Sequence, residues 1–267
     1  MEQETGKKRK TSNEQYYTKA SVAKECIKLI KETIKNSRTY QWIEPSAGTG
    51  AFLVRGCIAM DIEPKHKDII KQDFLQFTPK SVPEKTLIYG NPPFGRQSSL
   101  AKRFIRRAYS FANIIAFILP LSFTKASMSN IFPDHYHCVE SKVLEKDSFE
   151  VNGESYHVPC VFQIWIKKET KREREKPLVP EGFSYVKKED AFDIAIRRVG
   201  VYAGKAFLKD SQSFNKQCFY FIKLEDKTKI SKLVEEVNNH IFPSNTVGPR
   251  SLSKNEITSV LNLKLKD

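Results

Sequence analysis

The chain has 267 residues, of which 40% are hydrophobic, so it can bury the core of one large domain or of a domain with a small companion. No apolar stretch is long enough to cross a membrane, and the polar, basic start from Met1 to Lys10 does not resemble a secretory signal. The five cysteines are an odd number without a close pair, which indicates free thiols rather than a disulfide framework. These features favour an intracellular location, cytoplasmic or nuclear, and no membrane partner.

The chain is strongly basic. Lysine and arginine number 45 against 31 aspartates and glutamates, which gives a net charge of +14 and an isoelectric point near 9.4. This excess favours a polyanionic partner, most often nucleic acid, because phosphate binding by basic side chains releases counterions. Part of the charge is clustered on a helix predicted over residues 98–111, whose basic face either contacts backbone phosphates or is solvated. Nothing in the sequence indicates an oligomeric state.

Composition divides the chain into three parts. Residues 1–13 contain no apolar residue beyond Met1 and predict a disordered basic arm. Residues 14–176 alternate strand-like and helix-like patterns and predict an α/β domain, which ends at a run of charges closed by Pro177. Residues 177–267 predict a small C-terminal substrate-binding region of short strands and one helix. Its candidates for phosphate contacts are three cations, Arg197, Arg198 and Lys205.

A helix over residues 21–35 and a short strand over residues 38–44 lead into a glycine-containing turn, Pro45-Ser46-Ala47-Gly48-Thr49-Gly50. An apolar stretch from Ala51 predicts a helix after it. Strand, small turn and helix are typical of a nucleotide-cofactor loop, since glycines let the backbone approach a ligand. The turn matches neither the dinucleotide nor the phosphate-loop pattern, and Glu44 supplies a carboxylate. A ligand with an amino or sulfonium charge fits best; the alternative is a plain strand-to-helix turn.

Two further predicted strands end in acidic residues. The segment 57–64 carries Asp61, which we expect to accept ribose hydroxyls, with Glu63 in reserve. The segment 68–74 ends at Asp73-Phe74, a pair that can hydrogen-bond an adenine amine and cover its ring. The alternatives are a solvated strand end in the first case and a core phenylalanine beside a surface aspartate in the second.

The most informative stretch is Asn91-Pro92-Pro93-Phe94, which follows an apolar strand predicted over residues 86–90. Two consecutive prolines end the strand, and Asn91 is pushed to an extended conformation because a proline follows it. The result is a stiff loop that offers an amide side chain, a carbonyl and an aromatic ring. A planar group with an NH₂ can donate to the Asn91 side-chain oxygen and the Pro92 carbonyl while it lies against Phe94. The alternative is an ordinary strand-end turn.

The remaining patterns complete the fold prediction. Residues 114–120 are a fully apolar run, typical of a central parallel strand. Segments 141–150 and 156–167 flank Asn152-Gly153, a strong hairpin signal. We therefore expect an α/β fold whose sheet begins with strands alternating with helices and ends in an antiparallel hairpin. No metal is predicted, because the spacing of the histidines and cysteines matches no structural zinc pattern.

In this order the motifs resemble the S-adenosylmethionine-dependent amino-methyltransferases, specifically those that methylate adenine N6. The resemblance covers roughly residues 14–167, and the cofactor segments precede the catalytic motif, as in the gamma-type DNA enzymes. One departure is Lys19, where the family usually has proline. The segments that carry the resemblance are Tyr17-Thr18 with the following helix, Glu44 to Gly50, Asp61, Asp73-Phe74 and Asn91 to Phe94.

The resemblance implies a Rossmann-like class I methyltransferase fold with a mostly parallel seven-stranded sheet, and it makes residues 14–176 the catalytic domain. It implies S-adenosylmethionine as cofactor and the adenine N6 amine of DNA, flipped into the pocket, as substrate. The implied catalytic residues are Asn91, Pro92 and Phe94, with Pro93 at the substrate. The implied cofactor-binding residues are Tyr17, Thr18, Glu44, Ser46, Ala47, Gly48, Gly50, Phe52, Asp61, Ile62, Asp73 and Phe74.

Three alternatives stay open. An RNA adenine methyltransferase would use the same pocket. A protein glutamine methyltransferase is also compatible, because an Asn-Pro-Pro loop can hold a side-chain amide, although Phe94 and the net charge of +14 count against it. The third is a nucleic-acid-binding subunit that has lost catalysis, against which the intact acids and catalytic motif argue.

Overall fold

The computed structural model describes residues 16–79, 85–151, 153–243 and 249–266. The predicted arm over residues 1–13 lies outside these ranges. The chain forms two compact units that divide between Arg174 and Glu175, close to the boundary predicted at residues 176 and 177. No helix in the described ranges is both long enough and apolar enough to span a membrane. All five cysteines are free thiols.

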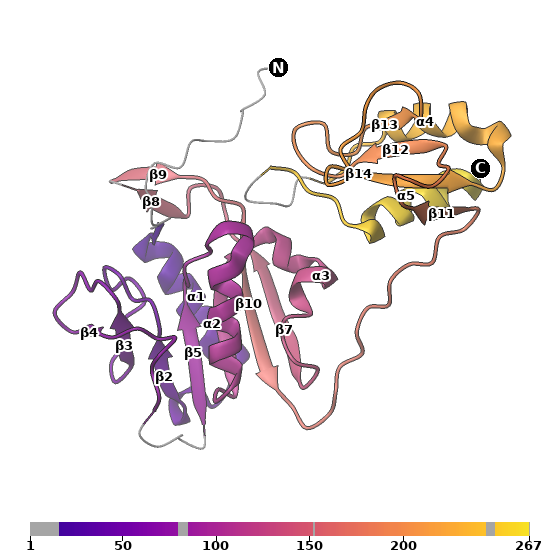
Figure 1. Ribbon diagram of the computed structural model, residues 1–267. Helices are drawn as coiled ribbons and strands as arrows, with labels where there is room; N and C mark the ends of the chain where they lie inside the picture. Colours follow the sequence, from indigo (N-terminus) through magenta and orange to yellow (C-terminus); the bar gives the residue numbers. More distant parts are fainter. Residues whose placement is uncertain (1–15, 80–84, 152, 244–248, 267) are drawn as a thin grey trace. The chain divides into compact units, whose positions relative to one another are not determined.

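The N-terminal unit is built on a seven-stranded sheet in the order β4-β3-β2-β5-β6-β10-β7 (Figure 1). Neighbouring strands run parallel along the part β4-β3-β2-β5-β6 of this order. Strand β10 is antiparallel to both of its neighbours, β6 and β7. This is the Rossmann-like, mostly parallel seven-stranded sheet that the sequence predicted. The strand bounds are β2 Gln41–Glu44, β3 Ile58–Asp61, β4 Ile70–Lys71, β5 Thr86–Gly90, β6 Ile114–Pro120, β7 Tyr136–Val143 and β10 Cys160–Lys167.

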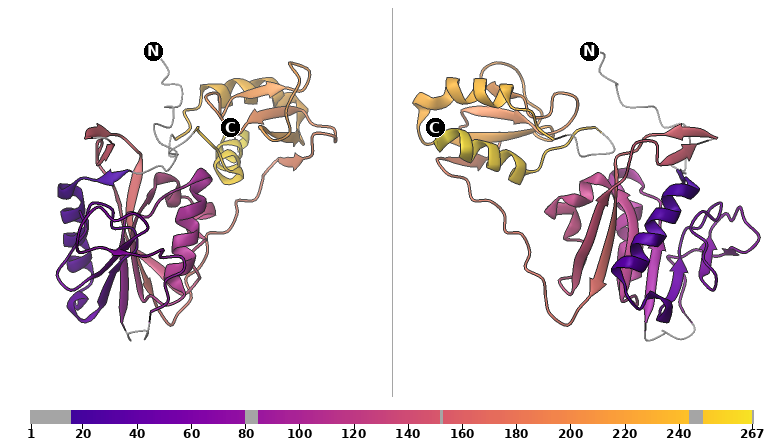
Figure 2. Two further views of the ribbon diagram at one scale, coloured as in Figure 1. Left: turned by 60° about the vertical axis from the view of Figure 1, so that its left-hand side comes forward. Right: turned by 180° about the vertical axis from the view of Figure 1, so that it is seen from behind.

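Helices cover both faces of this sheet. Helix α1 (Ala20–Thr33) lies on one face and α2 (Ser99–Tyr109) on the other, as the two views of Figure 2 show. Every residue of β5 and β6 is buried, as expected of central strands between two helical layers. A short helix, α3 (Ala126–Ser129), follows β6.

The predicted helix after Gly50 is absent, and this expectation was wrong. Residues 51–56 form turns and irregular chain instead. Only residues 51–57 separate the glycine turn from β3, and Gly56 takes a φ of +82°, so the chain bends back before a helix can form. Phe52 is still buried, and its carbonyl accepts a hydrogen bond from the Tyr89 hydroxyl at 2.9 Å.

The predicted antiparallel pair at the end of the large sheet is confirmed, but the Asn-Gly turn does not join its two strands directly. The turn at Gly153 joins two short strands, β8 (Phe149–Val151) and β9 (Glu154–Tyr156), which form a separate three-stranded sheet with β1 (Tyr17–Thr18). The long antiparallel pair is β7 with β10. Strand β7 ends at Val143, and the chain turns at Asp147, whose φ is +62°. The sequence therefore forms two antiparallel pairs where one was predicted.

The C-terminal unit is a four-stranded antiparallel sheet with two helices. The strand order is β11-β14-β12-β13, and both helices contribute to the larger hydrophobic cluster on one face. The other face carries a second cluster that contains Phe214, Phe219 and Phe221. The bounds are β11 Phe183–Val186, β12 Ile194–Arg197, β13 Ala206–Leu208, β14 Phe219–Leu224, α4 Ile230–Asn239 and α5 Lys254–Lys266.

Candidate active site

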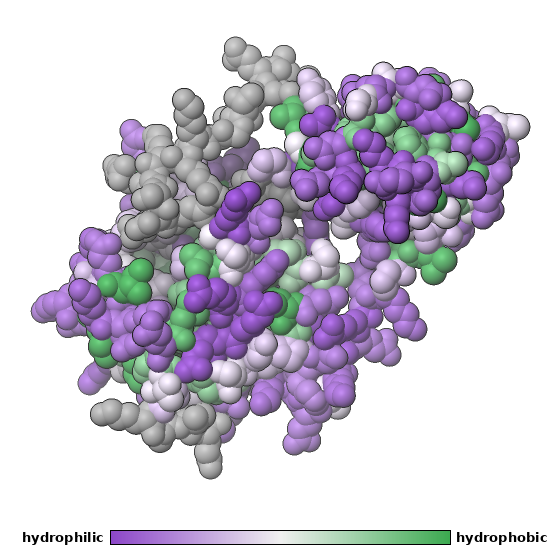
Figure 3. Space-filling view, viewed as in Figure 1, coloured by the Kyte–Doolittle hydropathy of each residue, from purple (hydrophilic) through white to green (hydrophobic). Residues whose placement is uncertain are grey.

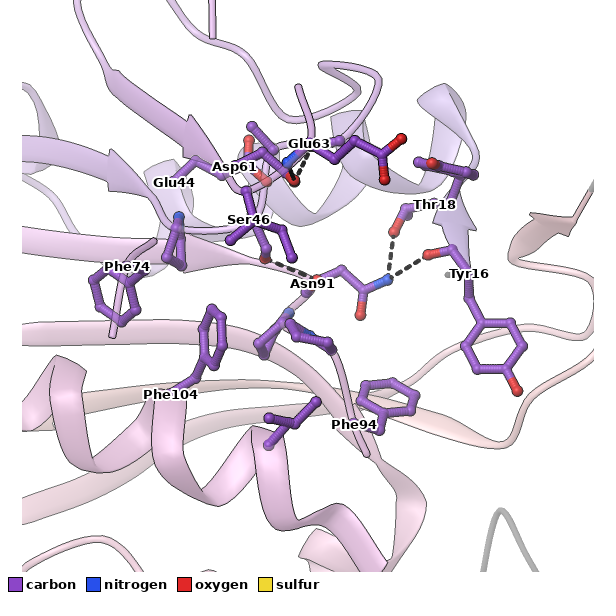
Figure 4. Close-up of a pocket in the computed structure, with 18 of the residues that line it drawn as sticks. Tyr16, Thr18, Glu44, Ser46, Asp61, Glu63, Phe74, Asn91, Phe94 and Phe104 are labelled. Carbon is purple, nitrogen blue, oxygen red and sulfur yellow. Dashed lines mark hydrogen bonds between the residues drawn. The ribbon is translucent and has the colours of Figure 1, made fainter. Parts of the chain in front are cut away.

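A cavity of about 560 Å³ lies where the parallel strands of the N-terminal unit end. Glu44 is the last residue of β2, Asp61 is the last residue of β3, and Asn91 directly follows β5. The three polar side chains therefore lie together at one edge of the sheet (Figure 4). Of the residues expected at the cofactor and target, those that line the cavity are Tyr17, Thr18, Glu44, Ser46, Ala47, Gly48, Phe52, Asp61, Ile62, Asp73, Phe74, Asn91, Pro92, Pro93 and Phe94. Gly50 is not in the lining.

The amide of Asn91 is held in one orientation. Its Nδ2 donates to the Tyr16 carbonyl oxygen and to the Thr18 hydroxyl, both at 3.1 Å, and the Ser46 hydroxyl donates to the Asn91 backbone carbonyl at 3.0 Å. These bonds fix which end of the amide is the nitrogen. The Oδ1 atom is buried and has no hydrogen-bond partner among the described residues. The cavity therefore contains an acceptor that is fixed in place and ready for a donor (Figure 4).

The two prolines and Phe94 form a stiff floor beside this acceptor. Phe94 is only 5% exposed, and its ring lies 6.3 Å from that of Tyr16, at an angle of 37°. Tyr16 in turn stacks on Tyr156 of β9 at 5.3 Å. Tyr16 was missed by the sequence analysis, although it is an aromatic residue next to the predicted Tyr17-Thr18 motif.

Glu44 is a buried carboxyl group in the cavity wall. It is 1% exposed, and its Oε2 atom has no hydrogen-bond partner within the described part of the chain. Burial, and secondarily the nearby charge of Asp61, raise the pKa of Glu44 well above its usual value. Gly90 makes room for this side chain: its φ is +128°, and a Cβ there would lie 2.7 Å from Glu44 Oε1. An unpaired carboxyl group in such a position suits a ligand that brings a positive charge.

Asp61 has a structural task that the sequence did not reveal. Its Oδ2 accepts the Gly48 backbone N–H and its Oδ1 accepts the Glu63 backbone N–H, each at 2.8 Å. It therefore ties the glycine turn to the end of β3, and its remaining lone pairs are available to a ligand. Glu63 also lines the cavity, but it is exposed, and its carboxylate accepts from Lys65 at 2.5 Å.

Asp73 and Phe74 do not end a strand, because β4 covers only Ile70–Lys71. Asp73 lies in a turn, where its Oδ1 accepts the Leu75 N–H at 2.9 Å. Phe74 is 1% exposed and packs on Phe104 of α2 at 5.3 Å. Phe74 is thus a core residue that also reaches the cavity. Phe104 lines the cavity too, although its place on the apolar side of a helix predicts only a core residue.

The C-terminal cations Arg197, Arg198 and Lys205 do not line the cavity, whose lining residues all belong to the N-terminal unit. Each lies over an aromatic ring of its own unit. Arg197 lies 5.7 Å from the Phe219 ring, Arg198 lies 5.0 Å from that of Tyr220, and Lys205 lies 6.0 Å from that of Tyr202. Their role in phosphate contact therefore stays a prediction.

Comparison with known proteins gives structural likeness only. No protein-family model matches the chain, and no curated protein is similar to it in sequence. A candidate RNA methyltransferase of Pyrococcus horikoshii is 16% identical, with a TM-score of 0.46 over 60% of this chain and 90% of that one. Magnesium protoporphyrin IX methyltransferase of Synechocystis, solved with S-adenosylmethionine, is 10% identical, with a TM-score of 0.40 over 55% and 79%. The N-methyltransferase NodS of Bradyrhizobium japonicum, solved with S-adenosylhomocysteine, is 13% identical, with a TM-score of 0.39 over 55% and 87%.

Proposed function

We propose that the chain is an S-adenosylmethionine-dependent methyltransferase that modifies the exocyclic N6 amine of adenine in nucleic acid, with DNA as the substrate. The observation that carries this proposal is the Asn91 amide. Its nitrogen is used by Tyr16 and Thr18, so its oxygen is left as a buried acceptor that faces a cavity with aromatic walls. An amino group on a planar ring is the donor that such a site accommodates.

The residues of the cavity fit the cofactor. A volume of about 560 Å³ falls within the range of roughly 300–1,000 Å³ that is usual for small-molecule sites. The unpaired Glu44 oxygen suits the amino group of the cofactor's methionine part, Asp61 suits the ribose hydroxyls, and Asp73 and Phe74 suit the adenine. Four carboxyl groups line this cavity, those of Glu44, Asp61, Glu63 and Asp73, and they also favour a ligand with positive charge over a dinucleotide phosphate.

When bound, S-adenosylmethionine would supply a methyl group activated by the sulfonium charge. The chain's own part is to prepare the acceptor amine, whose lone pair is otherwise delocalised into the adenine ring. Asn91 Oδ1 and the Pro92 carbonyl accept its two N–H groups and so favour a pyramidal nitrogen. The rigid prolines hold these oxygens in place before the reaction, which lowers the barrier through positioning and electrostatics rather than through a strong base.

The target base must leave any duplex to reach this cavity, because its amine is inaccessible within the stack. The Phe94 ring lines the cavity beside Asn91 and supports an extruded or single-stranded base by stacking. Stacking of a base on an aromatic ring contributes about 1–3 kcal/mol.

The experiment that tests the proposal supplies methyl-labelled S-adenosylmethionine with DNA, RNA and protein pools, followed by digestion and nucleoside analysis. Label in N6-methyladenine from DNA is the expected result. Label in N6-methyladenine from RNA alone would identify RNA as the substrate, and label in glutamine would identify a protein substrate. Cofactor binding without transfer to any pool would identify a silent binding subunit.

Replacing Thr18 by valine tests whether its hydroxyl orients the Asn91 amide. The change deletes an acceptor from a nearly buried site and keeps the side-chain shape, so kcat should fall about five- to twelvefold, the effect of one hydrogen bond of about 1–1.5 kcal/mol. Cofactor affinity should stay constant, and Thr18→Ser should retain the rate. Loss of cofactor binding with a normal kcat would instead assign Thr18 to the cofactor.

Replacing Asp61 by alanine should weaken S-adenosylmethionine binding at least about tenfold, since the ribose contact and an anchor of the glycine turn are lost together. The melting temperature should also fall, because two backbone N–H groups lose their acceptor. Calorimetric titration and thermal unfolding measure the two effects. Unchanged affinity here, with a loss in Glu63→Ala, would transfer the ribose role to Glu63.

A further inference from the structure

We infer that the exposed face of α2 and the loop before it form a binding track for the phosphates of a nucleic acid strand whose base enters the cavity. This track consists of Arg96, Lys102, Arg103 and Arg106. The inference rests on the proposed function and specifies where the N-terminal unit holds its substrate.

The first observation is the absence of acidic residues from this part of the sequence. None of the residues 85–133 is an aspartate or a glutamate, although they include the whole of β5, α2 and β6. Helices α1 and α4, in contrast, carry acids that pair with exposed lysines: Lys28 with Glu32 at 3.7 Å in α1, and Lys232 with Glu236 at 3.8 Å in α4. The acid-free face of α2 thus differs from an ordinary solvated helix surface.

The second observation is that the track cations make no ion pair with a described residue. Arg107, the fifth cation of this segment, is different: its guanidinium donates to the Phe77 carbonyl and lies 5.5 Å from the Phe111 ring. The track cations include the like-charged pair Lys102 and Arg106 one helical turn apart, a spacing that destabilises a helix. An anionic partner would remove this repulsion.

The third observation is that the track begins at the cavity. Arg96 lines the cavity and follows Phe94 by two positions, and Ser99 and Leu100 at the start of α2 line it too. Figure 3 shows strongly hydrophilic side chains gathered over α2 on the near face of the N-terminal unit. From Ser99 to Tyr109 the helix is about 16 Å long, enough for two or three successive phosphates. A strand lying along α2 would therefore present its base to Asn91.

The loop between Phe94 and α2 holds Arg96 in place. Gly95, Gln97 and Ser98 all have positive φ, at +67°, +53° and +59°. The backbone N–H groups of Leu100 and Ala101 donate to the Phe94 carbonyl at 3.1 and 3.2 Å, which ties the start of α2 to the catalytic motif. The first cation of the track and the aromatic ring of the pocket are thus connected by a few residues of constrained chain.

The test is the triple variant K102Q/R103Q/R106Q, which removes three track cations and leaves out the cavity residue Arg96. Glutamine is a good helix former, so α2 should persist. The matched control, K24Q/K28Q/K31Q, removes three exposed cations from α1 on the opposite face of the sheet. The probe is a labelled, adenine-containing single-stranded oligonucleotide. Its binding is measured by fluorescence anisotropy over a salt series, and its methylation is measured as separate kcat and KM.

The track variant should bind the oligonucleotide about tenfold more weakly at low salt. The plot of log K against log salt should become shallower by about 2, because three phosphate contacts on a single strand are lost. KM for the oligonucleotide should rise in parallel, with kcat and cofactor affinity unchanged, whereas the α1 control should stay within twofold. Equal effects in both triple variants would overturn the track. If the unmodified chain methylates no nucleic acid, the proposed function fails, while the binding series still decides whether α2 holds the strand.

Discussion

Replacing Asn91 by alanine is expected to lower methyl transfer at least about a hundredfold, the loss typical for one preorganised group that stabilises developing charge. Alanine removes the amide that the Tyr16 carbonyl and the Thr18 hydroxyl hold in position, and with it the buried acceptor Oδ1. S-Adenosylmethionine should still bind within about twofold, because Glu44, Asp61 and the glycine turn are unchanged. Single-turnover kinetics and calorimetric titration separate the two quantities.

Asn91→Asp sharpens this test. It keeps the shape of the side chain but places a carboxylate oxygen where the nitrogen now lies 3.1 Å from the Tyr16 carbonyl oxygen. Two acceptors would face each other, so the orientation of the group should be lost and transfer should fall as in the alanine variant. Near-normal turnover in either variant would contradict the role given to the amide.

Replacing Glu44 by glutamine is expected to weaken S-adenosylmethionine binding about ten- to a hundredfold, since a charge-assisted hydrogen bond contributes about 1.5–3 kcal/mol. The pKa of Glu44 is raised in the folded chain, so the buried carboxyl group must release its proton before it can pair with a cationic ligand. Cofactor affinity of the unmodified chain should therefore increase with pH until this group is ionised. The glutamine variant should show weak, nearly pH-independent binding.

The same substitution should stabilise the ligand-free chain. A carboxyl group whose folded pKa exceeds its unfolded value contributes stability that is complete below the unfolded pKa and is lost as pH rises. Glutamine stays neutral, so the difference in melting temperature between Glu44→Gln and the unmodified chain should grow from pH 5 to pH 8. Glu63→Gln, which alters an exposed carboxylate of the same cavity, should not change this pH dependence. A pH-independent difference for Glu44→Gln would contradict the buried, protonated state.

Patterns with a local physical cause were predictable from the sequence. The apolar segments 86–90 and 114–120 predicted the strands β5 and β6, because strands buried on both faces need apolar side chains throughout. The acids at 44 and 61 and the amide at 91 were expected to meet, because parallel strands end at the same edge of a sheet. The α/β order of the N-terminal unit followed from these elements.

Features that depend on distant segments were not predictable. The helix expected at Ala51 is a miss of another kind: the strand predicted from residue 57 left too few residues for a helix after the turn, so the conflict was visible in the sequence. The hairpin at Gly153 was recognised, but its pairing with β1 is a tertiary contact. For the same reason the Tyr16 carbonyl could not be identified as a partner of Asn91, since a backbone oxygen has no sequence signature.

The pairing of β1 with β8 has a consequence for biosynthesis. The residues that orient Asn91 precede it in the chain, yet the hairpin that anchors them follows it. The backbone N–H of Lys19, next to Thr18, donates to the Ser148 carbonyl, and the Lys19 ammonium contacts the hydroxyl of Ser155, which is 136 residues further along the chain. Because long-range contacts form late, a nascent chain that has emerged only through β6 would contain Asn91 and its neighbours without the clamp that aligns them. Competence for transfer should arise only once the segment through Tyr156 has left the ribosome and closed onto β1.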